Sequence, residues 1–147
     1  MIIEDKLMRY VLYKKRTVNE VRNKCKLLKY EENYIEDAIA YLEEAGYIND
    51  KIYVEKYIST IQKLKHMSIN EIRMDLMRRG IDDNLIDTAI YNEEIQEFEF
   101  ASAEYLVQKK MKAGEEIEKV KKFLLNKGYS YSNVSKAIDN WNDMNDN

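Results

Sequence analysis

An internal repeat of about 50 residues is the feature that most constrains how this chain can fold. Residues 17–39 match residues 68–90 after a shift of 51 positions, and residues 57–90 match residues 105–138 after a shift of 48, with no gap in either window. The matched pairs include Glu20 with Glu71, Val21 with Ile72, Ile35 with Ile86, Ile72 with Val120, Gly80 with Gly128 and Ala89 with Ala137. Tandem periods of this length are typical of repeat proteins, whose neighbouring units bury each other's apolar faces.

Each repeat has the pattern of three amphipathic helices. Apolar residues recur at steps of three and four, which places them on one face of a helix. The expected first helices are 2–16, 51–65 and 94–113, the second are 18–29, 69–79 and 115–127, and the third are 32–45, 82–92 and 131–142. We therefore predict an all-α fold of three tandem three-helix repeats, at residues 1–50, 51–92 and 93–147, stacked into an elongated array that is straight or curved.

Two of the second helices begin with the pattern of a capping box. Thr17 is followed three residues later by Glu20, and Ser68 is followed three residues later by Glu71. The hydroxyl and the carboxylate of such a pair accept hydrogen bonds from backbone N–H groups that a helix start leaves open. The third repeat lacks this pattern, so the start of its second helix is less sharply defined.

Glycine marks the end of two second helices. Gly80 and Gly128 fall where a helix ends in a left-handed residue, a conformation that glycine adopts without steric cost. Lys29 occupies that position in the first repeat, so we expect a different turn there.

The composition favours a cytoplasmic protein without disulfides. The chain has a single cysteine and no proline. Acids stand near the N-terminus, where a signal peptide needs a basic region, and the longest apolar run, 38–42, is far shorter than the ~20 residues that span a bilayer. The net charge of −3 argues against tight binding to naked DNA, because such binding draws on contacts between cations and phosphates.

No residue pattern points to catalysis, a metal ion or a cofactor. His66 is the only histidine, and it has no neighbouring set of Cys and His residues as a zinc site requires. Cys25 aligns with Leu76 and Leu124, which is the position of a core residue. Acidic pairs lie near turns and helix ends, and no glycine-rich phosphate loop is present. We therefore expect a protein that is not an enzyme and needs no cofactor.

One basic position recurs in all three repeats and has two interpretations. Arg22, Arg73 and Lys121 each follow a core residue, at the flank of the buried stripe. Stacked repeats would align them as a series that faces an acidic partner or phosphates. Alternatively, each stem covers apolar neighbours while the charged head stays in water.

Further basic residues stand near helix ends, where the helix dipole favours cations by ~0.3–1 kcal/mol each. This structural reason is sufficient by itself, so these residues are weaker candidates for contacts with a partner. They are Lys15, Arg16, Lys63, Lys65, Lys109 and Lys110 at the ends of first helices, and Arg78 and Arg79 at the end of a second helix.

Three motifs together resemble the RecX family, the regulators of the RecA recombinase. They are Leu42-x3-Gly46-Tyr47-Ile48-x-Asp50-x2-Tyr53-x3-Tyr57-Ile58, Ile72-x3-Leu76-x3-Gly80-Ile81-x4-Ile86-x2-Ala89-Ile90 and Val120-x3-Leu124-x2-Lys127-Gly128-Tyr129-Ser130-x3-Val134-x2-Ala137-Ile138. The likeness extends from about Thr17 to Trp141. It is specific because the repeat spacing and the glycine turns occur together.

The resemblance implies a regulator in homologous recombination, DNA repair and the SOS response. Such a protein binds the filament that RecA forms on single-stranded DNA and lowers its ATPase, strand-exchange and coprotease activities. A monomer is expected, with at most a weak direct contact to DNA. The alternatives are a helix-turn-helix module that binds DNA directly, which the net acidity disfavours, and a helical scaffold for another protein.

Overall fold

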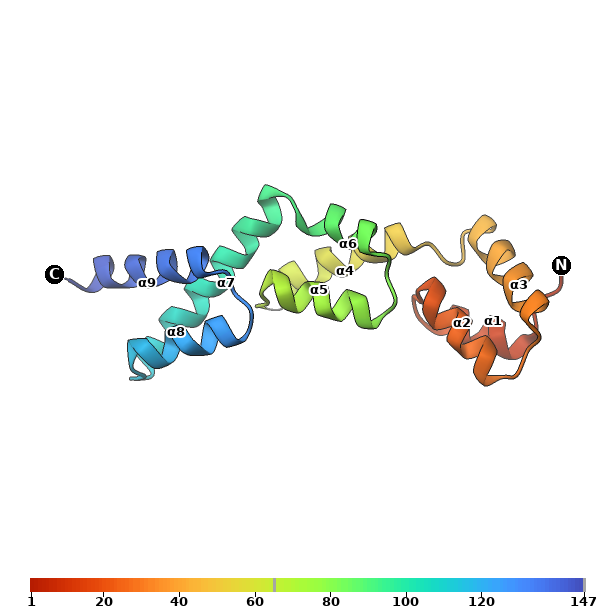
Figure 1. Cartoon of the computed structure of the whole chain (residues 1–147), viewed down its shortest axis with the longest axis horizontal. Coiled ribbons are helices and arrows are strands. Elements are labelled where there is room, and N and C mark those ends of the chain that lie inside the picture. Colours follow the sequence, from red (N-terminus) through yellow and green to blue (C-terminus); the bar gives the residue numbers. More distant parts are fainter. Residues whose placement is uncertain (65, 147) are drawn as a thin grey trace. The chain divides into compact units, whose positions relative to one another are not determined.

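The structure is a computed structural model that describes residues 1–64 and 66–146. Figure 1 shows the helices in sequence order, and the described residues form no strand. The helices are α1 (Asp5–Tyr13), α2 (Val18–Leu27), α3 (Glu32–Glu44), α4 (Asp50–Leu64), α5 (Ile69–Arg78), α6 (Asp83–Ile90), α7 (Glu93–Lys112), α8 (Ile117–Asn126) and α9 (Tyr131–Asn145). The all-α prediction is confirmed, and the helices fall into three successive triplets, α1–α3, α4–α6 and α7–α9.

The observed helix bounds follow the sequence pattern to within a few residues. The largest differences are at α1, which is shorter than 2–16 at both ends, and at α9, which continues past the expected 142 to Asn145. Helix α6 ends at Ile90 rather than at 92, and Asn92 caps α7. The Asn92 side chain accepts a hydrogen bond from the N–H of Ile95 at 3.0 Å. Lys65, the expected last residue of the helix 51–65, lies outside the described residues. The repeat boundaries at 50/51 and 92/93 stay a prediction.

The second helix of each triplet supplies two fully buried side chains at equivalent positions. These side chains are Val21 and Cys25 on α2, Ile72 and Leu76 on α5, and Val120 and Leu124 on α8, each with no exposed area. Cys25 is therefore a core residue, as expected. The third helices contribute a second set of buried apolar residues, including Ile35 and Leu42 on α3, Ile86 and Ile90 on α6, and Val134 and Ala137 on α9.

The chain forms two compact units, and each contains one junction between consecutive triplets. The first unit comprises Met1–Tyr57 and Leu76–Ile86, and the second comprises Ile58–Asp75 and Asp87–Asn147. The first junction joins the start of α2 to the end of α5, and the second joins the start of α5 to the end of α8. The two junctions use the same contacts.

The first junction is built on the capping hydroxyl of Thr17, which is fully buried. The Thr17 Oγ1 accepts a hydrogen bond from the N–H of Glu20 at 3.1 Å and donates one to the carbonyl oxygen of Arg79 at 2.8 Å. The Glu20 carboxylate completes the predicted capping box by accepting from the N–H of Thr17 at 2.9 Å. One hydroxyl thus satisfies a donor at the start of α2 and an acceptor at the end of α5.

The second junction repeats this arrangement with Ser68, which is also fully buried. Its Oγ accepts from the N–H of Glu71 at 3.0 Å and donates to the carbonyl oxygen of Lys127 at 2.8 Å. The Glu71 carboxylate accepts from the N–H of Ser68 at 3.0 Å, so the second predicted capping box is confirmed. The Lys127 ammonium lies 3.5 Å from the other Glu71 oxygen and adds an ion pair.

The close approach of an asparagine side chain to the glycine backbone explains why glycine stands at each of the two junctions. Gly80 and Gly128 have φ of +77° and +94°, so the predicted left-handed helix ends are confirmed. A Cβ on Gly80 would overlap with the side chain of Asn19, and a Cβ on Gly128 would lie 2.7 Å from the Cβ of Asn70. Lys29, the equivalent residue of the first triplet, has φ +62°, so the expectation of a different turn there is wrong.

A carboxylate from the following triplet completes each junction. Asp50 Oδ1 accepts from the N–H of Val18 at 2.9 Å, and Glu99 Oε2 accepts from the N–H of Ile69 at 2.7 Å. Both N–H groups belong to the first residue of a second helix, where negative charge is favoured. Glu99 is 1% exposed, and its other oxygen accepts from the N–H of Ser130 and from the Asn133 side-chain amide at 3.0 and 2.9 Å.

We expect Gly128→Ala to destabilise the chain more than Gly114→Ala. Both glycines have left-handed φ, +94° and +86°, so each alanine costs roughly 1–2 kcal/mol of conformational energy. Only Gly128 has a neighbour within 4 Å, and the overlap with Asn70 should add about 1–3 kcal/mol. Denaturant unfolding of the two variants measures the difference. Equal losses, or no recovery when Asn70→Gly is added to Gly128→Ala, would contradict the close-approach explanation.

We expect Glu99→Gln to lower the free energy of unfolding by about 1–3 kcal/mol. The carboxylate accepts three N–H hydrogen bonds, whereas a glutamine would direct its own NH2 group at one of these donors. Glu97→Gln, on the exposed side of the same helix, is the matched control and should change stability by less than ~0.5 kcal/mol. Urea unfolding of both variants distinguishes a buried acceptor from a general effect of removing charge.

Candidate functional site

Arg22, the first member of the recurring basic series, forms an ion pair within its own triplet. Its Nη1 contacts the Glu36 carboxylate of α3, and 29% of the Arg22 side chain is exposed. The hydrogen bond that Arg22 donates to the Glu36 carboxylate raises the pKa of the Arg22 guanidinium above its ordinary value. Arg22 therefore fastens α2 to α3, and the exposed remainder of the side chain is available for a partner.

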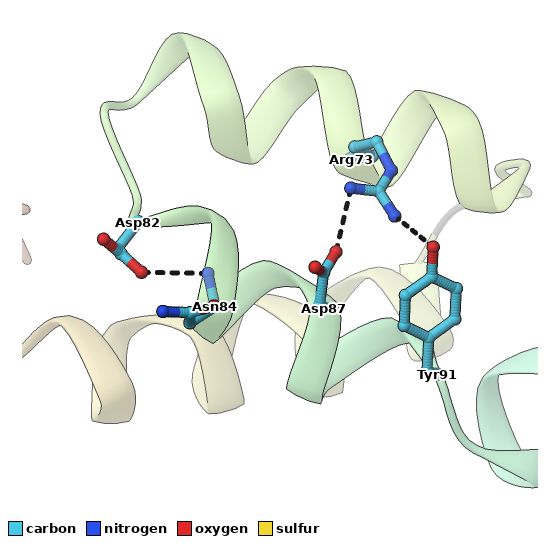
Figure 2. Close-up of polar contacts among 5 residues, drawn as sticks. All are labelled: Arg73, Asp82, Asn84, Asp87 and Tyr91. Atoms are coloured by element: carbon cyan, nitrogen blue, oxygen red, sulfur yellow. Dashed lines mark hydrogen bonds and ion pairs between the residues drawn. The ribbon is translucent and has the colours of Figure 1, made fainter.

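Arg73 forms the equivalent pair in the middle triplet. Figure 2 shows its guanidinium between two acceptors, Asp87 Oδ1 at 3.0 Å from Nη1 and the hydroxyl of Tyr91 at 3.0 Å from Nη2. Asp87 occupies the position of Glu36 after the shift of 51, so the pair is part of the repeat. The same view shows Asp82 accepting from the N–H of Asn84 at 2.9 Å, which caps the start of α6.

Lys121 keeps the cation in the third triplet, but its acidic partner is replaced. Ser135 occupies the position of Asp87 after the shift of 48, and the Lys121 ammonium instead lies 5.2 Å from the centre of the Tyr131 ring. A cavity of about 450 Å³ between α8 and α9 is lined by Lys121, Tyr131 and Ser135, with Glu118 and Asp139 also on its wall. The alignment of Arg22, Arg73 and Lys121 along one face stays a prediction, because Arg22 belongs to the first unit and the other two to the second.

The structure brings two of the other predicted residues, Lys15 and Arg16, together in one small groove of the first unit. We call it the basic notch; it has a volume of about 150 Å³ and is lined by Lys15, Arg16, Tyr47, Ile52, Tyr53 and Lys56, with the turn 46–49. Arg16 is held in place by Tyr10, because its Nε donates to the Tyr10 carbonyl oxygen at 3.0 Å and its guanidinium lies 3.8 Å from the ring centre.

Sequence reasoning missed Lys56, the third cation of the notch. It lies on the exposed face of α4, one helical turn after Tyr53. No short-range sequence pattern marks Lys56, and only the folded chain shows that this face meets Lys15 and Arg16.

The remaining predicted cations are distributed over both units. In the first unit, Arg79 donates to the Tyr53 hydroxyl and lies 5.2 Å from the centre of the Tyr57 ring. In the second, Lys110 pairs with Glu115 at 3.4 Å and lies 4.0 Å from the centre of the Phe123 ring. The other residues are exposed or outside the described part: Lys63, Arg78 and Lys109 are exposed, and Lys65 lies outside the described residues.

The described residues contain no group of three or more His, Cys, Asp or Glu side chains that could hold a metal ion. Burial raises the pKa of the Cys25 thiol, and no part of that side chain is exposed, so Cys25 is unsuited to act as a nucleophile. His66 stacks on Tyr105 with 3.9 Å between ring centres. Among the helices of residues 1–64 and 66–146, none combines the length and apolarity that a membrane span requires.

Comparison with known proteins identifies the family. The family model described as "RecX, second three-helix domain" matches residues 49–90. The "Regulatory protein RecX" of Staphylococcus carnosus is 32% identical over 137 residues, which cover 90% of this chain and 51% of the relative. The protein of the same name from Clostridium beijerinckii is 31% identical over 145 residues, covering 94% of this chain and 67% of the relative.

Solved structures agree with the sequence comparison. The crystal structure of RecX from Lactobacillus salivarius superposes with a TM-score of 0.81 at 28% identity, covering 92% of each chain. A second crystal structure, of a regulatory protein RecX, gives a TM-score of 0.80 at 24% identity and shares the fold. The chain spans about half to two thirds of the length of the curated relatives described above. On these similarities and the repeat geometry, the chain belongs to the RecX family of regulatory proteins.

Proposed function

We propose that this chain is a cytoplasmic, monomeric and non-enzymatic regulator that binds the RecA filament on single-stranded DNA. Binding lowers the ATPase, strand-exchange and coprotease activities of RecA. Membership of the RecX family carries the proposal, because the relatives that match most of the chain bear the name "Regulatory protein RecX". The absence of a metal-binding group in the described residues is compatible with regulation by binding.

We propose that the partner binds to the predicted basic residues whose charged groups are partly or fully exposed. Arg22, Arg73 and Lys121 recur at one position, and their heads remain partly exposed beside α3, α6 and α9. A filament presents the same surface at regular intervals along its length. A chain built of repeats can present the same cation to several of these repeated surfaces. Cations on the rim of an interface act mainly through the rate of association and the choice of partner.

Direct binding to DNA is the competing function, and charge disfavours it. The net charge is −3, and both Arg22 and Arg73 already pair with carboxylates. A protein that binds duplex DNA by neutralising phosphates loses affinity steeply as salt rises. A titration with duplex DNA in the absence of RecA therefore separates the two functions.

We expect the purified chain, at less than one copy per RecA, to slow ATP hydrolysis by RecA on single-stranded DNA. The chain should co-sediment with RecA–DNA filaments and not with the same DNA alone. The control is a sample of the chain unfolded by heat and cooled, after circular dichroism has shown that its helices are lost. If the folded chain leaves both the hydrolysis rate and filament length unchanged, the proposed function is wrong.

We expect Arg73→Ala to weaken inhibition of RecA several-fold and Asp87→Ala to leave it intact or strengthen it. Both substitutions remove the same ion pair and should lower thermal stability by a small amount, somewhat more for Arg73→Ala because it also removes the hydrogen bond to Tyr91. Only Arg73→Ala removes the cation that we assign to the partner. Measured inhibition curves that shift equally for the two variants would show that Arg73 acts only within its triplet.

A further inference from the structure

We infer that the basic notch binds an acidic segment of a protein partner, with a Glu or Asp side chain inserted between Lys15 and Lys56. The inference deepens the proposed function, on which it rests, by naming the chemistry of the partner segment. It depends on three properties of the notch, which are its charge, its size and its fixed shape.

The charge of the notch is one-sided. Lys15, Arg16 and Lys56 line it, and no carboxylate does. Lys15 and Lys56 are exposed, and neither forms an ion pair with an acidic residue of the part that the structure describes. The notch therefore differs from the positions of Arg22 and Arg73, whose cations already have acidic partners within the chain. A carboxylate from outside would meet two unpaired ammonium groups and the guanidinium of Arg16.

The size of the notch suits one inserted side chain. Its volume of about 150 Å³ is below the ~300 Å³ at which pockets for small molecules begin. Tyr47 and Ile52 lie beside the cations with 42% and 46% of their surface exposed. They offer apolar contact to the residues that flank an inserted carboxylate. An acidic segment that also contains an aromatic or aliphatic residue matches both parts of the surface.

The walls of the notch are fixed before any partner arrives. The N–H of Tyr47 donates to the Leu42 carbonyl oxygen at 2.9 Å, and Ile48 is buried, which holds the turn 46–49. Asn49 Oδ1 accepts from the N–H of Ile52 at 3.0 Å, and Asp50 ties the start of α4 to Val18. Lys15 and Arg16 immediately precede the Thr17 cap of the same junction. Little backbone conformational entropy is then lost on binding.

A nucleic acid is the less suitable occupant. Tight binders of DNA neutralise several phosphates along a track, whereas this chain has a net charge of −3 and pairs its recurring arginines internally. The notch is also too small to enclose a series of stacked bases, which single-strand binders hold on aromatic platforms. A protein segment needs only one carboxylate and a short apolar neighbour.

The test measures binding of a fluorescein-labelled random copolymer of glutamate and tyrosine to the full chain by fluorescence anisotropy. We expect Lys15→Glu combined with Lys56→Glu to weaken binding at least about tenfold, because two favourable charge pairs become repulsive. The matched control is Lys26→Glu, an exposed lysine of α2 outside the notch, which should change the dissociation constant by less than about twofold. Circular dichroism checks that all variants remain helical.

Three outcomes would overturn the inference. One is that the copolymer does not bind, the second is that Lys26→Glu weakens binding as much as the notch variant, and the third is that labelled oligothymidylate binds the notch more tightly than the copolymer. The RecA assay separates this failure from failure of the proposed function. If the chain inhibits RecA but the copolymer binds all variants equally, the inference about the notch is wrong and the proposed function stands. If the copolymer binds as expected but RecA activity is unaffected, the proposed function is wrong.

Discussion

A buried hydroxyl that bonds in two directions holds consecutive helix triplets together. Thr17 and Ser68 each accept from the backbone of their own helix and donate to the last turn of the second helix of the next triplet. Alanine at either position would leave a buried carbonyl and a buried N–H without partners, and each such group costs about 1–3 kcal/mol. Valine would do the same while filling the space. The apolar core provides most of the stabilisation, but these polar contacts determine which helix ends can meet.

The same junction positions the candidate binding residues. Asp50 fastens the start of α4 to the start of α2, and the cations Lys15, Arg16 and Lys56 lie beside this contact. The recurring pairs, Arg22 with Glu36 and Arg73 with Asp87, join the second helices to the third helices. Some basic residues of this chain thus complete the fold, and we propose that others bind a partner.

Local patterns in the sequence predicted much of the fold. The capping boxes, the glycines at helix ends and the core positions of Val21 and Cys25 depend on residues within a few positions of one another. Other features depend on contacts between distant segments. Glu99 looks like one more surface acid of α7, and its burial follows from donors 30 or more residues away. At Lys29 the sequence misled in another way, because a lysine adopts the left-handed conformation that was expected only of glycine. For the candidate site, the sequence supplied Lys15 and Arg16 but not Lys56, since no short-range pattern joins them.

The three triplets differ in whether they carry both sides of the contact between asparagine and glycine, so they are not equally suited to being copied in tandem. Only the middle one has both halves of the contact, with Ser68 and Asn70 at one end and Gly80 at the other. The first has Lys29 at the glycine position, and the third has Glu116 and Glu118 at the positions of the hydroxyl and the asparagine. A designer who wishes to lengthen this protein should therefore copy the middle triplet together with Asp50, whose carboxylate completes a junction, because only this triplet carries the hydroxyl and the asparagine at one end and the glycine at the other.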